Sequence, residues 1–152
     1  LLSTIAMYAA ARARDAAKVS KAQNDLRQMG TAINLLVADA GKWPNGCPAE
    51  KIIDKGVLST DAAAGIMVKP VESDQGDGCF WTVSDVGRWG GPYMPISSDP
   101  WGNPYYVDLQ YAPLTNCAGK TPHGTIPAVV SFGPNGAGVD AEDCDDIWYS
   151  LL

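Results

Sequence analysis

The first 40 residues of the chain contain no proline, and this segment restricts the possible folds more than any other. In its second half, apolar residues recur at alternating spacings of three and four, at Val19, Ala22, Leu26, Met29, Ile33, Leu36 and Ala40. This spacing is typical of one face of an amphipathic helix, and Gly41 suits the C-terminal stop. The pattern predicts a single helix over 1–40, roughly 60 Å long at about 1.5 Å per residue.

The first eleven residues, LLSTIAMYAAA, are uncharged and mostly apolar, and basic residues follow from Arg12 onwards. A membrane span needs ~20 apolar residues, so this segment has the composition of the second half of a span. We expect that Leu1 is not the start of the mature chain. Because so long a helix exceeds what one small domain covers, we expect 1–18 to protrude and 19–152 to be globular. The alternative, two helices broken between Tyr8 and Arg14, has no glycine or proline to support it.

After Pro44 the chain is rich in glycine, and fewer segments show a clear period. The predicted elements are a short helix over 49–58, a strand over 79–83, two stronger strands over 105–111 and 125–132, and a loop over 133–148. In the last strand, Ile126, Ala128, Val130 and Phe132 fall on one face. The predicted fold class is therefore α+β, with the long N-terminal helix packed on a small antiparallel sheet.

The segment DPWGNPYY at 99–106 contains two prolines and a glycine, which indicates a tight turn before the strand at 105–111. We expect the carboxylate of Asp99 to accept a hydrogen bond from the backbone two residues later. Along the strand, alternation places Tyr105, Val107, Leu109 and Tyr111 on one face. Turn chemistry does not explain Trp101.

Charge is distributed unevenly around a net value of −6. Residues 1–42 carry six Lys and Arg against three Asp and Glu, whereas 43–152 carry five against fourteen. An acidic globular part argues against a nucleic-acid-binding surface and suits a divalent cation better. The single histidine, His123, excludes a site built on two histidines of one chain, and we expect it on a surface loop. No nucleophile motif or phosphate-binding loop is present, so we expect that the protein is not an enzyme.

Four cysteines, Cys47, Cys79, Cys117 and Cys144, lie in the loop-rich part without a CxxC pair. This spacing suits two disulfides in an oxidising compartment better than zinc, with four buried thiols as the alternative. Of the three possible pairings we favour Cys47–Cys79, which closes the insertion after the helix. The second bond, Cys117–Cys144, would then tie a hairpin loop to the acidic tail.

The tail SFGPNGAGVDAEDCDDIW combines a glycine-rich turn with acidic residues. Calcium prefers six to eight oxygen ligands from carboxylates and carbonyls on a bent loop. Asn135, Asp145 and Asp146 offer side-chain oxygens, with Asp140, Glu142 and Asp143 as further donors. The segment does not follow the EF-hand pattern, since the sixth position from Asp140 is Asp145 rather than glycine. The alternative is a solvated acidic loop.

Several segments together resemble type IV pilins and the major pseudopilins of type II secretion. LLSTIAMY resembles the later part of the pilin hydrophobic segment, and the helix that follows closes on GKWP as in that family. GPYMPISSDPWGNPYY and the ending SFGPNGAG…DDIW resemble stretches of the major pseudopilins. The likeness covers most of the chain except 61–86 and 112–124. Departures include Asn135 in place of the family's usual aspartate, and Tyr8 where many members have proline.

The resemblance implies a pilin-like fold with a C-terminal calcium loop. It implies that the side chains of Asn135, Asp145 and Asp146 and the carbonyls of Phe132 and Ala137 bind Ca²⁺. It also implies that Trp101 is a core anchor that holds its turn against the helix. Assembly would use Leu1, Leu2, Ile5, Met7, Tyr8, Arg12, Arg14, Asp15 and Lys18, with Asp25 as a further member of the charged group.

The implied function is a structural subunit of a helical filament. Its partners would be other copies of the chain, minor pilins or pseudopilins, the assembly platform and the bacterial inner membrane. The subunit, with a methylated N-terminus, would leave that membrane for a periplasmic or extracellular filament. The ending DDI favours a pseudopilus over a surface pilus without deciding between them. The alternative function is a membrane-tethered, secreted, Ca²⁺-dependent binding module.

Overall fold

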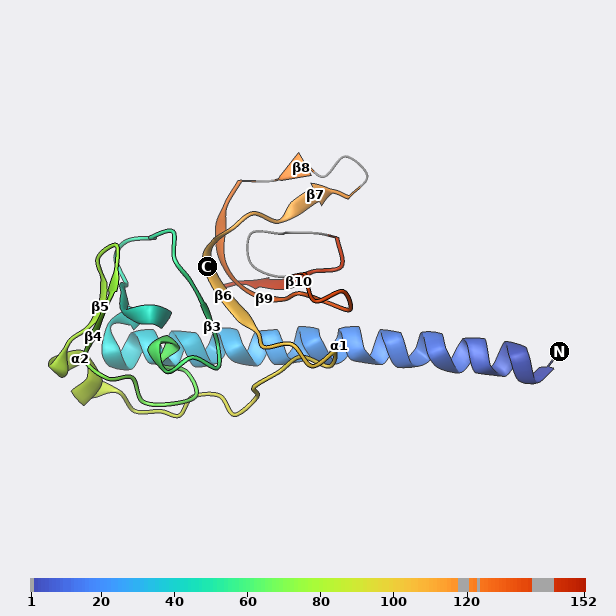
Figure 1. Cartoon of the computed structure of the whole chain (residues 1–152), viewed down its shortest axis with the longest axis horizontal. Helices are drawn as coiled ribbons and strands as arrows, with labels where there is room; N and C mark the ends of the chain where they lie inside the picture. The colour runs from blue at the N-terminus through green and yellow to red at the C-terminus, as the bar shows by residue number, and fades with distance from the viewer. Residues whose placement is uncertain (1, 118–120, 123, 138–143) are drawn as a thin grey trace.

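A computed structural model describes residues 2–117, 121–122, 124–137 and 144–152. Its longest element is helix α1, Leu2–Ala40, which runs along most of the length of the molecule (Figure 1). The rest of the chain gathers around the C-terminal part of α1, so the N-terminal part extends beyond it (Figure 1). A single helix is therefore confirmed, and the alternative of a break between Tyr8 and Arg14 is wrong. In the described part of the chain, no helix is long and apolar enough to cross a membrane.

The two halves of α1 differ in burial. Residues 3–18 are all exposed. The predicted apolar stripe is buried from Ala22 onwards, at Ala22, Leu26, Met29, Ile33, Leu36 and Ala40, while Val19 is half-buried at its edge. Apolar residues every three or four positions thus place one side of the helix against the core, as expected.

The main sheet has four antiparallel strands in the order β10-β9-β6-β3. Its members are β3 (Gly56–Leu58), β6 (Tyr106–Tyr111), β9 (Ile126–Ser131) and β10 (Ile147–Ser150). The strands predicted over 105–111 and 125–132 are β6 and β9, with ends trimmed by a residue. The predicted fold class, a long helix on antiparallel strands, is confirmed.

Two-stranded pairs and single turns complete the chain. The strand pairs are β1 (Lys42–Trp43) with β2 (Cys47–Pro48), β4 (Ser73–Gly76) with β5 (Cys79–Trp81), and β7 (Leu114–Asn116) with β8 (Thr121–Pro122). The remaining elements are the 3-10 turns η1 (Pro44–Gly46) and η2 (Ala62–Ala64) and the short helix α2 (Val83–Arg88).

Three of the elements predicted from the sequence differ from the structure. The helix predicted over 49–58 is absent there, because a segment so short has little intrinsic helical stability and its end, Gly56–Leu58, pairs with β6 instead. The strand predicted over 79–83 ends at Trp81, since Thr82 caps α2. The last part of the loop predicted over 133–148 belongs to strand β10.

Both faces of the sheet are buried, which alternation alone did not predict. Tyr105, Val107 and Leu109 pack with the stripe of α1 in one cluster. The opposite face forms a second cluster of Tyr106, Tyr111, Ala128, Val130 and Phe132, with Leu58 and Ile126 packed against it. The prediction that Tyr111 shares a face with Tyr105 was wrong, because the β6–β9 register shifts between Asp108 and Tyr111. Such an irregularity reverses which face a later side chain occupies.

A buried carboxylate joins α1 to the sheet. Asp25 of α1, 2% exposed, accepts hydrogen bonds from Tyr105 Oη and Lys21 Nζ, each at 2.8 Å. Burial, the hydrogen bond to Asp25 and the charges of Asp25 and Asp99 raise the pKa of Tyr105. An inter-subunit role for Asp25 is therefore wrong, because its carboxylate is buried and engaged within its own chain.

The turn at 99–103 is organised by Asp99 rather than by Trp101. The Asp99 carboxylate, 3% exposed, accepts from the backbone N–H of Trp101 at 3.0 Å and of Asn103 at 2.9 Å, and from Ser131 Oγ at 2.7 Å. The first of these bonds confirms the predicted turn. Trp101 is only half-buried and belongs to neither core cluster, so its predicted role as a core anchor is wrong.

The C-terminal end of α1 is capped by a residue far along the chain. Arg88 of α2 donates to the carbonyl of Ala40 at 3.0 Å and to Asp85 Oδ1 at 2.8 Å. Burial favours a higher pKa for Asp85, but hydrogen bonds with Thr82 and the charges of Lys42 and Arg88 outweigh it and lower that pKa. The cationic side chain also suits the negative end of the helix dipole.

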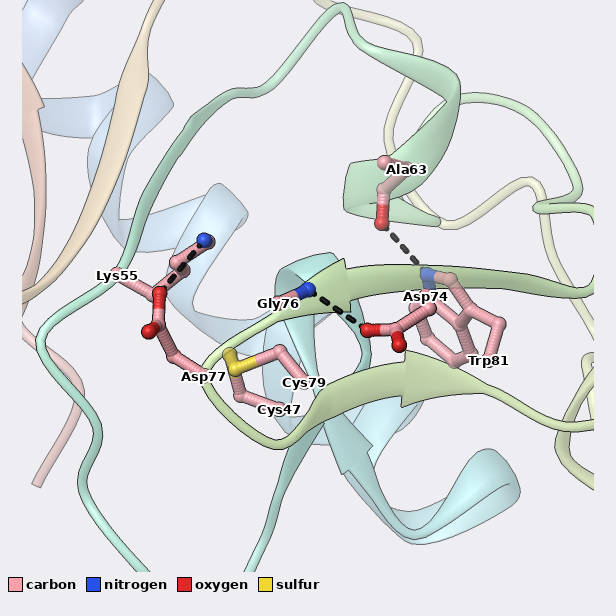
Figure 2. Close-up of a disulfide and its surroundings, with 8 residues drawn as sticks. All are labelled: Cys47, Lys55, Ala63, Asp74, Gly76, Asp77, Cys79 and Trp81. Atoms are coloured by element: carbon pink, nitrogen blue, oxygen red, sulfur yellow. Dashed lines mark hydrogen bonds and ion pairs between the residues drawn. A yellow bond between two sulfur atoms is a disulfide. The ribbon is translucent and has the colours of Figure 1, made fainter.

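A disulfide between Cys47 and Cys79 joins the segment after α1 to β5 (Figure 2). This pairing confirms the prediction, and both residues are fully buried. Gly46, next to Cys47, lies against the backbone of β5. A Cβ atom placed on Gly46 would lie 2.7 Å from the carbonyl carbon of Phe80.

Substitution of Gly46 by alanine tests this backbone contact. Gly46 and Gly102 both have positive φ, of 72° and 90°, but a Cβ on Gly102 meets nothing within 4 Å. We expect Gly102→Ala to cost about 1–2 kcal/mol from backbone strain alone. Gly46→Ala should cost about 1–3 kcal/mol more, because β5 cannot retreat from the new methyl group. Urea unfolding measures both, and equal losses would contradict the contact.

Candidate metal-binding loop

The candidate loop connects two paired strands. Strand β9 ends at Ser131, and its partner β10 begins at Ile147, which lies opposite Ser131 in the register. Phe132 directly follows Ser131, and Asp146 directly precedes Ile147. These two predicted ligands therefore flank the first residue pair of the β9–β10 ladder. After Phe132 the chain turns, with the N–H of Gly136 donating to the carbonyl of Gly133 at 3.2 Å.

Hydrogen bonds bring the two ends of the loop together. The backbone N–H of Asn135 donates to Asp145 Oδ2 at 3.0 Å, and the N–H of Ala137 donates to Asn135 Oδ1 at 2.7 Å. Asp146 Oδ2 accepts from Tyr111 Oη at 3.2 Å. The Oδ1 atoms of Asp145 and Asp146 are buried. The predicted residues thus converge, with Asn135 and Asp145 linked directly and Asp146 held from β6.

A close backbone approach at Gly133 shapes the loop. A Cβ on Gly133 would collide with the carbonyl oxygen of Asp145 and lie 3.0 Å from its Oδ2. Only glycine therefore allows the turn after β9 to approach Asp145 this closely. Backbone and side-chain oxygens of Asp145 consequently lie beside the same turn that carries Asn135.

The donor set is made of oxygen atoms, which matches the chemistry of calcium or magnesium rather than that of zinc. Within the described residues, no group of three Asp, Glu, His or Cys side chains is arranged to hold a metal ion. Asp140, Glu142 and Asp143, predicted as further donors, lie outside the described residues, as does His123. A carboxylate oxygen has two lone pairs, so the same oxygen can accept a hydrogen bond and also bind a cation.

The second disulfide, Cys117–Cys144, ends one residue before Asp145. Its Cα atoms lie 5.6 Å apart, and the pairing confirms the prediction. In contrast to Cys47 and Cys79, both of its cysteines are exposed. The bond ties the residue after β7 to the position directly before the candidate ligands Asp145 and Asp146.

Sequence reasoning missed two residues that support this loop. Tyr111 was assigned to the other face of its strand, so its contact with Asp146 was not predicted. Asn103 was read as a turn residue only, yet its amide lies 3.1 Å from where a Cβ on Gly136 would sit. The turn at 99–103 and the candidate loop are therefore neighbours, although no spacing in the sequence connects them.

The predicted assembly residues lie along the N-terminal half of α1. Ile5, Met7 and Tyr8 are 65%, 72% and 66% exposed. Arg12, Arg14, Asp15 and Lys18 are exposed as well, with the Arg12 guanidinium 5.8 Å from the centre of the Tyr8 ring. Leu1 lies outside the described residues, and Leu2 begins the helix.

Comparisons of this chain with protein-family models, with curated proteins and with solved structures gave no match. The features of the molecule that bear on its function are the exposed half of α1 and the loop between β9 and β10.

Limited reduction should distinguish the two disulfides by accessibility. Thiol–disulfide exchange requires access of the attacking thiolate to a sulfur atom. We expect low concentrations of reductant to open Cys117–Cys144, whose cysteines are exposed, before the buried Cys47–Cys79 bond. Trapping the free thiols and mapping the labelled peptides by mass spectrometry measures the order. Simultaneous opening of both bonds in the folded protein would contradict this prediction.

Proposed function

We propose that this protein is a structural subunit of a helical filament of the pilin or pseudopilin class. The observation that supports the proposal is the change in burial along α1. From Ala22 to Ala40 one face of the helix is buried, whereas residues 3–18 are exposed on every side. The C-terminal half of this helix therefore packs in the folded domain. The N-terminal half, with its apolar side chains, is available to a partner.

The hydrophobic effect makes that exposed half the source of assembly. The free energy falls when large apolar side chains such as Ile5 and Met7 leave water, whether they enter lipid or pack among other helices. Before assembly, the inner membrane is the proposed environment. In the filament, copies of the same helix replace the lipid, together with those of minor pilins or pseudopilins delivered by the assembly platform.

Calcium is proposed as the stabiliser of the loop between β9 and β10. Phe132, Asn135, Ala137, Asp145 and Asp146 would supply its oxygen ligands. Adjacent carboxylates at 145 and 146 repel each other, and a divalent cation removes that repulsion. The loop would then fix β10 against β9, because the ligand residues flank the first pair of that ladder.

The first test concerns assembly. A chain that lacks residues 1–18 should remain folded and monomeric, because the buried face of α1 begins after that segment. The full-length natural chain should form filaments in which the helices occupy the centre. Sedimentation of the truncated chain and electron microscopy of the full-length chain measure the two results.

The outcomes separate the proposed filament from a simple tether. Full-length chains that remain monomers in detergent after processing would support a membrane-tethered binding module instead. Filaments with α1 facing solvent would contradict the role assigned to its apolar residues. A truncated chain that still formed filaments would move the assembly surface to the globular part.

The second test concerns calcium. Extracellular calcium sites have dissociation constants of ~10⁻⁴–10⁻³ M, and ligand at ten times that value stabilises a protein by ~1.4 kcal/mol. We therefore expect calcium to raise the melting temperature by about 3–6 °C, given roughly 2–4 °C per kcal/mol at this size. Chelator should reverse the rise, and magnesium should not reproduce it.

Variants assign the effect to the loop. Asp146→Ala should abolish the calcium-dependent shift, and Asp145→Ala should nearly abolish it. Asp61→Ala removes an exposed carboxylate outside the loop and serves as the control. In the filament, Asp146→Ala should prevent assembly at calcium concentrations at which the natural chain assembles. A melting temperature that does not respond to calcium would contradict the calcium site and favour the alternative, a solvated acidic loop.

A further inference from the structure

The insertion that follows α1 forms a surface hollow of about 450 Å³. It lies on the hairpin of β4 and β5 and is lined by Glu72, Ser73, Asp74, Phe80, Trp81 and Thr82. All of these lining residues fall in 61–86, the stretch that has no counterpart in the pilin resemblance. Neither the exposed half of α1 nor the candidate metal-binding loop contributes to it.

The chemistry of the lining suits a cation. Glu72 and Asp74 are exposed carboxylates, and the Phe80 ring is 42% exposed. Lysine already contacts this ring, because Lys42 Nζ lies 4.3 Å from its centroid. That ammonium is also 3.7 Å from Asp85 Oδ2, so a carboxylate outside the hollow balances its charge. Carboxylates beside an aromatic face form the usual environment of a bound guanidinium.

The hollow is held in a fixed shape. Asp74 Oδ1 accepts the backbone N–H of Gly76 at 2.8 Å, and Trp81 Nε1 donates to the carbonyl of Ala63 at 2.7 Å (Figure 2). The neighbouring Cys79 is bonded to Cys47 (Figure 2). A ligand would therefore meet side chains that are already positioned, which lowers the entropic cost of binding.

The opposite charge is displayed at the other end of the same molecule. Arg12, Arg14 and Lys18 are exposed on the N-terminal half of α1, with Asp15 as the only acidic residue among them. We propose that the hollow on β4 and β5 binds the Arg12–Arg14 segment of a second copy of this chain. The proposal rests on the filament function and names one contact surface within it.

The geometry of α1 makes this contact an assembly contact. The basic segment and Lys42, beside the hollow, are separated by about 27 residues of one straight helix, or ~40 Å at about 1.5 Å per residue. The distance is too great for a chain to fill its own hollow along a rigid helix. Contact between different surfaces of two copies is heterologous, and it repeats into a filament when the rotation between copies does not close into a ring.

Neutral variants test the contact in the full-length natural chain. Glu72→Gln combined with Asp74→Asn should raise the concentration needed for assembly roughly tenfold, as expected for losing two ion pairs of about 0.7 kcal/mol each. The matched control, Glu50→Gln with Asp54→Asn, removes two exposed carboxylates outside the hollow and should assemble normally. Thermal unfolding establishes that both variants are folded.

Cross-linking gives a second, independent measurement. A chain with both Ala13→Cys and Val71→Cys, two exposed positions beside the paired charges, keeps those charges; treated with a short bifunctional maleimide after assembly, it should give a ladder of covalent multimers. Each single variant should give at most dimers. If the natural chain forms no filaments, the proposed function fails. If the natural chain forms filaments, either of two results overturns the contact. One is a hollow variant that assembles at the same concentration as the natural chain. The other is a double-cysteine chain that gives no product larger than a dimer.

Discussion

The packing of one face of α1 against the sheet is the contact on which the remaining structure depends. It joins the stripe from Leu26 to Ala40 to Val107, Leu109 and Val129 in one cluster. Burial of this apolar surface supplies the main favourable free energy. The hydrogen bond between Tyr105 Oη and the buried Asp25 adds a directional contact to this packing, and its loss would be costly because it would leave a carboxylate unsatisfied in the core.

The C-terminal end of α1 is held by polar and covalent links instead. Its last carbonyl is bound by Arg88, and the segment after it is joined to β5 through Cys47 and Cys79. Polar and covalent links thus fix the insertion, while apolar packing fixes the sheet. This division explains how an insertion with little sheet structure of its own keeps a defined surface, including the hollow at Phe80.

The sequence predicted the features that depend on local period and on simple chemistry. The spacing from Val19 to Ala40 identified the helix, alternation identified β6 and β9, and cysteine positions favoured the observed pairing. It failed where long-range contacts decide. Gly56–Leu58 became a strand because β6 offered it a partner, and Tyr111 changed face through an irregularity in the β6–β9 register. The candidate ligands were identified from composition and resemblance, whereas the support from Tyr111, Gly133 and Asn103 arises only in three dimensions.

The position of β10 has a consequence for how the chain folds as it is synthesised. This strand lies at the edge of the sheet beside β9, and Tyr149 packs so closely on Gly30 of α1 that a Cβ there would lie 2.6 Å from its ring. The packing of α1 is therefore complete only when β10 has formed beside β9. Contacts this distant in sequence slow folding, because a long stretch of chain must be ordered to form them. A nascent chain therefore keeps part of α1 uncovered until β10 has left the ribosome and can pair with β9.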